Sequence, residues 1–432
     1  MSQRLAVFAV LLVGLGPLGP RPAAANGAFP MPFALFADER RGPELLVASN
    51  FGLLATEDDG RAWTWTCEGF ETTSAFAYTL DSDPGQRRLF ALTAAGLFFT
   101  DDLGCAWTPA RLPVAGEVSD AFPIHRDGAL HVFAIGYFQA PDGQRPAGLM
   151  VSGDGGQTFE GPVYRAEPGV TLVSVELARD GSALYLTSYT DQAGATILRA
   201  DGQGKTWERF PVAPPLDRYL ARIILVDPAH PATLWLRLQG TDRDVLARSD
   251  DGGRSLRAVL DEPGVISGAA PAGDGGLFVV SQQGKEGQLA RLSAGGEVMS
   301  RQRLPFAPVG LTRAGSRLFT IPSGYPDKAM AMVSADGGAT WSVYGRFEPS
   351  LEVRACVKAT GQCRLACGLG AATLLPQEIC GSAPAPDGGA PDTAAPPAPT
   401  RRGGCSAGGP AQGPAGLVAL LLLTFACRRR RR

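Results

Sequence analysis

An eight-residue pattern that recurs along this 432-residue chain constrains its fold more than any other feature. The clearest copy, at 334–341, reads Ser-Ala-Asp-Gly-Gly-Ala-Thr-Trp. Copies with Ser or Thr first, Asp third and a large apolar residue last lie at 56–63, 100–107, 152–159 and 249–256. A degenerate copy ends at Trp207, and 293–296 holds the remnant of another. Recurrence at intervals of 41 to 52 residues predicts an array of similar supersecondary units.

Each unit contains four short runs with strand character, separated by turn-forming residues. In the second unit the runs are 74–80, 88–93, 97–100 and 106–112, and in the fifth they are 221–226, 233–238, 245–248 and 255–260. The 55 Gly and 35 Pro residues disfavour a helical bundle. Seven such units predict an all-β fold, a seven-bladed β-propeller of four-stranded blades over 28–350. No strand is left over to interlock its first and last blades, so we expect them to meet by packing or through a staple.

The repeated pattern resembles the Asp-box, or BNR, repeat of sialidase-type and sortilin-type propellers. The residue types suit a tight turn, because Asp and Ser close it by hydrogen bonds and Gly adopts a positive φ. The final aromatic residue then anchors the outgoing strand. We therefore expect structural roles for Asp58, Asp102, Asp154, Asp251 and Asp336, and for Trp63, Trp107, Phe159, Trp207 and Trp341.

Six of the eight cysteines are candidates for disulfides. Cys67 follows the first repeated turn and Cys105 lies in the second, so twisted neighbouring blades make a Cys67–Cys105 bond feasible. The other four, Cys356, Cys363, Cys367 and Cys380, crowd a Cys-rich cap at 351–381, where three pairings stay open. A zinc site is the alternative there. A Cys-stapled module after an Asp-box propeller also loosely resembles the arrangement in sortilin.

The N-terminus has the pattern of an export signal. Arg4 precedes an apolar segment at 5–18, and Ala23, Ala24 and Ala25 supply the small residues of a cleavage site. We expect a signal peptide over 1–25 that is removed after Ala25. An N-terminal membrane anchor is the alternative, but the apolar run is short and ends in Gly and Pro. Export permits disulfides.

The C-terminus predicts a stalk and a sorting signal. The linker at 382–402 is rich in Pro, Ala and Gly, which favours an extended spacer. The tail at 403–432 holds Cys405, an apolar run at 416–427 and five terminal arginines. As a helix this run spans about 18 Å, less than the ~30 Å hydrocarbon core of a bilayer. The tail resembles the MYXO-CTERM sorting tail of myxobacterial surface proteins. That resemblance implies cleavage near Cys405 by a sorting protease and display at the cell surface or outer membrane.

Charge and composition exclude some functions. Positive charge is concentrated at the two ends, which leaves residues 26–400 clearly acidic. An acidic body argues against nucleic acid as a partner, since nucleic-acid binding needs a basic face. With three histidines in the whole chain, a metal site built from histidine is not expected, and no cofactor is implied.

The propeller topology predicts which face binds a ligand. With the strands of each blade named a to d from the centre outward, a–b and c–d turns share one face, while b–c turns and blade crossings form the other. The repeated turns are c–d turns. Arg126, Arg179 and Arg313 lie at a–b turns beside them, so they are turn residues and not a sialidase-like carboxylate clamp.

The b–c loops carry the candidate ligand-binding residues. The loop at 136–148 holds Tyr137, Phe138 and Arg145, the loop at 188–194 holds Tyr189, and the loop at 323–328 holds Tyr325. Exposed aromatic side chains beside charged groups are typical of glycan or protein recognition. The alternative is that these aromatic rings fold back onto the rim of the propeller.

The sequence therefore favours a non-enzymatic cell-surface propeller with a binding or scaffolding role, whose partner is a glycan or a surface protein. The alternative is a secreted glycoside hydrolase of sialidase-like or xyloglucanase-like type. The Arg-Ile-Pro type motif expected near the first sialidase blade is absent, and no Tyr/Glu nucleophile pair is identifiable. Paired carboxylates on the b–c face, at the mouth of the central channel, would favour the hydrolase.

Overall fold

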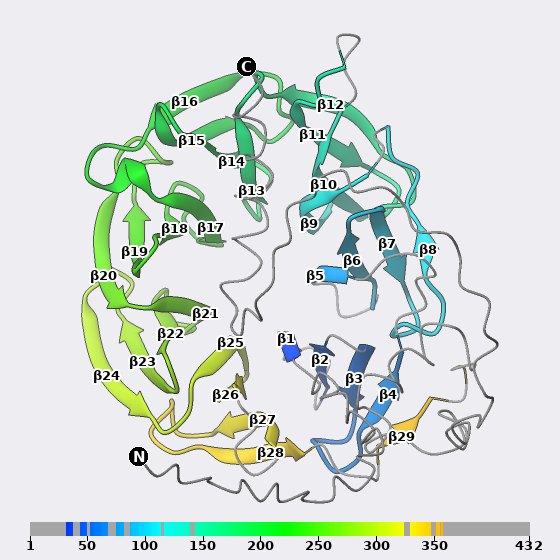
Figure 1. Cartoon of the computed structure of the whole chain (residues 1–432), viewed down its shortest axis with the longest axis vertical. Helices are drawn as coiled ribbons and strands as arrows, with labels where there is room; N and C mark the ends of the chain where they lie inside the picture. The colour runs from blue at the N-terminus through cyan, green and yellow to red at the C-terminus, as the bar shows by residue number, and fades with distance from the viewer. Residues whose placement is uncertain are drawn as a thin grey trace, which may run out of the picture. The chain divides into compact units, whose positions relative to one another are not determined.

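The computed structural model describes residues 32–37, 44–49, 52–67, 75–81, 87–113, 116–138, 143–323, 329–346, 351–354 and 356. All of them belong to the first of two compact units, Met1–Ala383. Their strands form seven sheets arranged around a common centre, antiparallel except for one parallel pair at the edge of the first sheet (Figure 1). The prediction of an all-β, seven-bladed propeller with four-stranded blades is confirmed.

The strands of each blade follow one another in the chain. Blade one contains β1 (Pro32–Ala37), β2 (Leu45–Ser49), β3 (Gly52–Thr56) and β4 (Thr64–Thr66), and blade two contains β5 (Ala75–Leu80), β6 (Leu89–Thr93), β7 (Gly96–Thr100) and β8 (Thr108–Pro109). Blade three contains β9 (Val118–Arg126), β10 (Ala129–Tyr137), β11 (Ala147–Ser152) and β12 (Glu160–Arg165), and blade four contains β13 (Thr171–Leu177), β14 (Ala183–Thr190), β15 (Gly194–Asp201) and β16 (Trp207–Pro211). A short 3₁₀ helix, η2 (Leu216–Arg218), leads into blade five, which contains β17 (Leu220–Val226), β18 (Leu234–Gln239), β19 (Arg243–Ser249) and β20 (Arg257–Pro263). Blade six contains β21 (Val265–Pro271), β22 (Leu277–Gln283), β23 (Glu286–Leu292) and β24 (Val298–Leu304), and blade seven contains β25 (Pro308–Ala314), β26 (Arg317–Pro322), β27 (Ala329–Ser334) and β28 (Ser342–Arg346).

The hydrophobic core consists of separate clusters, one at the interface of each pair of adjacent blades. Trp65 and Phe319, for example, join blade one to blade seven, and Trp235 and Leu277 join blade five to blade six. Because each sheet is covered on both faces, its second strand is buried along most of its length. This explains why such strands are continuous apolar runs rather than alternating ones.

The innermost strand of every blade contains a shift in pairing register where it meets the second strand. A bulge of this kind interrupts the ladder and leaves backbone groups without a partner in their own sheet. Neighbouring blades supply partners for several of these groups. Asp120 Oδ2 accepts a hydrogen bond from Val175 N at 2.9 Å, and Ser174 Oγ accepts one from Ile223 N at 3.0 Å. These hydrogen bonds, made close to the bulges, link successive blades.

The first and last blades are joined by a strand that the sequence did not suggest. The segment β29 (Glu352–Val353) pairs in parallel with β4 and adds a fifth strand to blade one. Its backbone N–H groups at Glu352 and Arg354 donate to the carbonyls of Trp63 and Trp65 at 3.0 and 3.1 Å. The expectation that no strand remained for closure is wrong, because two residues assigned to the Cys-rich cap extend the sheet.

The disulfide linking this closing segment also differs from the prediction. Cys105 is bonded to Cys356, 251 residues later, with Cα atoms 5.5 Å apart. The Cys67–Cys105 pairing is therefore wrong, and so is the pairing of Cys356 within the cap. Cys67 is itself disulfide-bonded. Cys363, Cys367, Cys380 and Cys405 lie outside the described residues.

The repeated pattern forms the turn between the third and fourth strands of its blade. Asp336 Oδ1 accepts hydrogen bonds from Ser334 Oγ at 2.8 Å and from Thr340 N at 2.9 Å, and Ser334 Oγ accepts one from Gly338 N. The same contacts recur around Asp58, Asp102, Asp154 and Asp251. Hydrogen bonds from the Thr340 hydroxyl and N–H and from Ser334 lower the pKa of Asp336 to about 2.

The aromatic residue that ends each turn is buried to different extents. Trp63 and Phe159 are buried, whereas Trp107, Trp207 and Trp341 are partly buried. Trp207 and Trp341 donate Nε1–H to the carbonyl of a glycine three residues earlier, at 2.9 and 3.0 Å. In the degenerate copy Asp201 replaces the usual Asp and accepts a hydrogen bond from Lys205 N.

Candidate functional site

The face with the repeated turns holds its charged groups in structural contacts. Its a–b and c–d turns lie side by side, since Gly155 N donates to Leu130 O at 3.0 Å and Arg126 Nη1 donates to Gly202 O at 3.2 Å. Arg126, Arg179 and Arg313 are on this face at the ends of their inner strands, as predicted. They are dispersed over blades three, four and seven and form no cluster.

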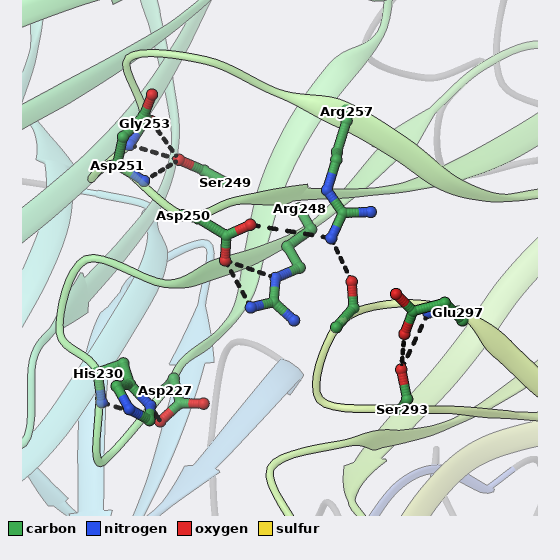
Figure 2. A network of polar contacts seen from close by, with 11 residues as sticks. Asp227, His230, Arg248, Ser249, Asp250, Asp251, Gly253, Arg257, Ser293 and Glu297 are labelled. Atoms are coloured by element: carbon green, nitrogen blue, oxygen red, sulfur yellow. Dashed lines mark hydrogen bonds and ion pairs between the residues drawn. The ribbon is translucent and has the colours of Figure 1, made fainter.

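Figure 2 shows this face at blades five and six. Arg248 Nε donates to Asp250 Oδ1 at 2.8 Å, and Arg257 reaches the same carboxylate while donating to the carbonyl of Gly295 in the next blade. The Arg248 guanidinium also lies over the Trp235 ring, 5.0 Å from its centroid. Arg248 therefore supports its own blade and Arg257 links blade five to blade six, so both are poor candidates for ligand contacts.

Two of the three predicted tyrosines, Tyr137 and Tyr189, lie on the opposite face, each at a junction between blades. Tyr137 ends β10 and packs partly buried against the cluster between blades three and four. Burial raises the pKa of its hydroxyl, Glu117 raises it further, and Arg145 opposes both. Tyr189 lies near the end of β14 and packs partly buried between blades four and five. Arg145 is exposed, and Tyr325 lies outside the described residues.

Phe138 is not an exposed loop aromatic, so that expectation is wrong. Its side chain is 4% exposed and belongs to the cluster between blades two and three. Gly148 makes this possible, because a Cβ there would lie 2.6 Å from the Phe138 ring. The Arg165 guanidinium lies 5.7 Å from the ring centroid. Here the alternative interpretation, an aromatic ring folded back into the propeller, is the correct one.

Three charged residues meet on the inner strands of blades three, four and five, and we call them the inner-strand cluster: Asp120 on β9, Glu176 on β13 and Arg222 on β17. Arg222 Nη1 donates to Asp120 Oδ1 at 2.9 Å, and Val175 N donates to Asp120 Oδ2. Burial raises the pKa of Glu176 well above its usual value, the nearby Asp120 carboxylate adds to the increase, and Arg222 opposes it. The structure thus brings together one carboxylate held by hydrogen bonds and one carboxyl group that favours its protonated form.

A polar cavity of about 190 Å³ opens between blades five and six. It is formed by the end of β20, the β22–β23 hairpin and the outer strand β24, so it lies on the face of the b–c turns and blade crossings. Most of the lining side chains are carboxylates, amides or hydroxyls, namely Glu262, Ser281, Gln282, Gln283, Glu286 and Gln288, and Arg303 adds a guanidinium. The arrangement is suited to hydrogen bonding with a small polar group.

Two further properties of the described residues bear on function. Within them, no group of three or more His, Cys, Asp or Glu side chains is placed to hold a metal ion. None of the helices that the structure describes is long and apolar enough to cross a membrane.

Comparison with known proteins places the chain by fold only. No family model and no curated protein matches it. Among solved structures it is similar to a Mycobacterium tuberculosis puromycin-hydrolyzing peptidase, with 15% identity and a TM-score of 0.53, over 76% of this chain and 55% of the other. It also matches a prolyl oligopeptidase B from Galerina marginata, with 12% identity and a TM-score of 0.48, over 72% of this chain and 50% of the other. A third match is an ancestral GH74 enzyme, with 14% identity and a TM-score of 0.40, over 76% of this chain and 55% of the other. The chain spans about half the length of these structures, so the similarity concerns the propeller.

Neither the inner-strand cluster nor the cavity was identified from the sequence. The available signal was a charged residue within an apolar inner strand, as Glu176 is within Thr171–Leu177 and Arg222 is within Leu220–Val226. A sequence does not show which inner strands face one another across two blades, so these charges could not be assembled into one site.

Proposed function

We propose that this chain is a surface-displayed binding propeller that holds a glycan or protein ligand on the face of the b–c turns and blade crossings. The observation that carries the proposal is the polar cavity between blades five and six, a concave site on that face. Concave sites with a few convergent polar groups are where proteins usually hold small ligands. The partly buried Tyr137 and Tyr189 on the same face provide further recognition surface.

The location at the cell surface is part of this proposal. The Cys105–Cys356 disulfide supports export, because disulfides persist in oxidising compartments. The turn contacts around Asp336 and its counterparts support grouping the chain with the Asp-box propellers. We further propose that the signal peptide 1–25 is removed and that a sorting protease processes the tail near Cys405. Mass spectrometry of surface material should find a chain that begins near Asn26 and lacks 428–432; an intact arginine run would contradict the sorting proposal.

The inner-strand cluster favours a second candidate, a glycoside hydrolase. A carboxyl group with a raised pKa beside an ionised carboxylate is the usual acid and base arrangement of such enzymes. We prefer binding because both oxygens of Asp120 already accept hydrogen bonds, from Arg222 and from Val175, that link three blades. A carboxylate engaged in this way is poorly suited to attack a sugar or to activate a water molecule.

The two functions are separated by one set of measurements on the full chain. We expect it to bind a member of a glycan or surface-protein panel and to release no product from a polysaccharide panel. Glu176→Gln keeps the shape of the side chain and removes its acid function. Polysaccharide cleavage by the wild-type chain that disappears in Glu176→Gln would refute the binding proposal and establish the hydrolase.

A further inference from the structure

The cavity between blades five and six contains a buried, fixed acceptor. The Glu262 carboxylate, on β20, is 2% exposed; Arg301 donates to its Oε1, and Ser281 Oγ lies 3.3 Å from its Oε2. An ionised carboxylate offers about four acceptor positions, and these contacts use two of them. Glu262 is therefore held in one orientation by groups on the next blade while retaining acceptor capacity on the cavity side.

Another part of the cavity lining lies where the blade crossing closely approaches the b–c hairpin of blade six. Gly264 follows β20 with φ +86°, and a Cβ there would lie 2.3 Å from the carbonyl oxygen of Gln282. The end of β22 is thereby brought against the crossing, and Gln282 lines the cavity formed between them. Gln288, on β23, lines it as well. Each amide side chain offers both a donor and an acceptor.

The charges of the cavity are balanced. Glu262 is paired with Arg301, and Glu286 is paired with Arg303 at the exposed edge of the cavity. The two acidic side chains that line the cavity are therefore each paired with an arginine, and the site presents little net field to an ion. An anionic or cationic ligand would have to disrupt one of these pairs, whereas a neutral ligand with many hydroxyl groups would not.

The volume of the cavity restricts the size of the ligand. A volume of about 190 Å³ leaves room for one sugar ring with its hydroxyl groups. An apolar anchor of a protein partner would offer no hydrogen bonds to the amides of Gln282 and Gln288 that line the cavity, which is unfavourable.

We propose that this cavity binds one neutral monosaccharide unit of a glycan, with the carboxylate of Glu262 and the amides of Gln282 and Gln288 as hydrogen-bonding partners of its hydroxyl groups. This inference rests on the proposed function, since it specifies the ligand class and the subsite on the binding face. It assigns the b–c face between blades five and six, and not the tyrosines of blades three and four, as the primary contact.

The test uses the full chain and methyl glycosides of glucose, galactose, mannose and N-acetylglucosamine, with sialic acid and glucuronic acid as anionic probes. Binding is followed by ligand-observed NMR and isothermal titration calorimetry. We expect at least one neutral glycoside to bind and the anionic sugars to bind more weakly or not at all. Preferential binding of the anionic sugars would overturn the assignment of ligand class.

Variants locate the site. The double variant Gln282→Ala/Gln288→Ala removes two amides at solvent-accessible positions, and we expect affinity to fall about tenfold for two lost hydrogen bonds. Gln203→Ala, an exposed glutamine on the opposite face, is the matched control and should bind as the wild type does. Unchanged melting temperatures establish that both variants are folded.

Two negative outcomes have different meanings. Wild-type affinity in the double variant, together with weakened binding in Tyr137→Ala, would refute the cavity assignment and leave the proposed function intact. Failure of the full chain to bind any glycan or surface protein would refute both the cavity assignment and the proposed function.

Discussion

The disulfide between Cys105 and Cys356 should make a large contribution to the stability of the propeller, because it closes a very long loop. Its two cysteines are 251 residues apart, and the chain-entropy relation for a loop of this length gives about 5.5 kcal/mol at 298 K. Cys67 is disulfide-bonded as well. A second crosslink shortens the effective loop, so about 5.5 kcal/mol is the upper value.

The perturbation is the double variant Cys105→Ala/Cys356→Ala, which leaves no unpaired thiol at this position. We expect a loss of about 3–5 kcal/mol in the free energy of unfolding, measured by denaturant titration with intrinsic fluorescence. Non-reducing peptide mapping of the wild-type chain should recover Cys105 and Cys356 in one linked peptide. A loss below about 1 kcal/mol, or a linked peptide that joins Cys105 to Cys67, would refute the proposed closure.

Three further predictions concern single side chains. Trp341→Ala should lower the free energy of unfolding by about 2–3 kcal/mol, because this partly buried ring packs edge-on against Phe306 and its Nε1–H donates to Gly338 O. A denaturation midpoint that hardly changes would contradict this. Asp336 has a pKa of about 2, lowered from 3.8 by its hydrogen bonds. Its stabilisation is therefore present above pH 4 and is lost as pH falls from about 4 to 2, so Asp336→Asn should flatten the melting-temperature profile in that range. For Glu176 the sign is opposite, because its raised pKa makes the folded state lose stability as pH rises above about 4.5. Glu176→Gln should therefore have a melting temperature at pH 7 no lower than that of the wild type. A lower melting temperature would refute the argument that burial raises this pKa.

The blades could be predicted because their determinants are local. The turn around Asp336 is specified by residues within seven positions of one another, and the apolar runs that become β17 and β18 are visible in the sequence. The same locality explains why the face of Arg126 and Arg179 was correctly assigned. Strand, turn and face all follow from a repeat whose geometry is the same in each copy.

The misassignments arose where a side chain or strand depends on distant parts of the chain. Phe138 is buried because Gly148, across a loop, leaves room for its ring, and loop position alone suggests exposure. β29 contains only two residues, too few for a recognisable strand pattern, and it forms because β4 offers an unpaired edge. The inner-strand cluster requires Asp120, Glu176 and Arg222 to converge from three blades. Their convergence depends on how the inner strands of neighbouring blades are placed around the centre of the propeller.

The position of the closing segment also bears on how the propeller is held at its C-terminal end. After β28 the chain returns to blade one as β29 and is then bonded covalently to blade two through Cys356. A force applied to the chain beyond Cys356 is therefore transmitted to Cys105 in blade two before it reaches the hydrogen bonds of β28 in blade seven. An unprotected outer strand would be the first element to be peeled from such a ring, because it is paired along one edge only. The closing strand and the disulfide thus protect the last blade from a force that is applied through the residues after Cys356.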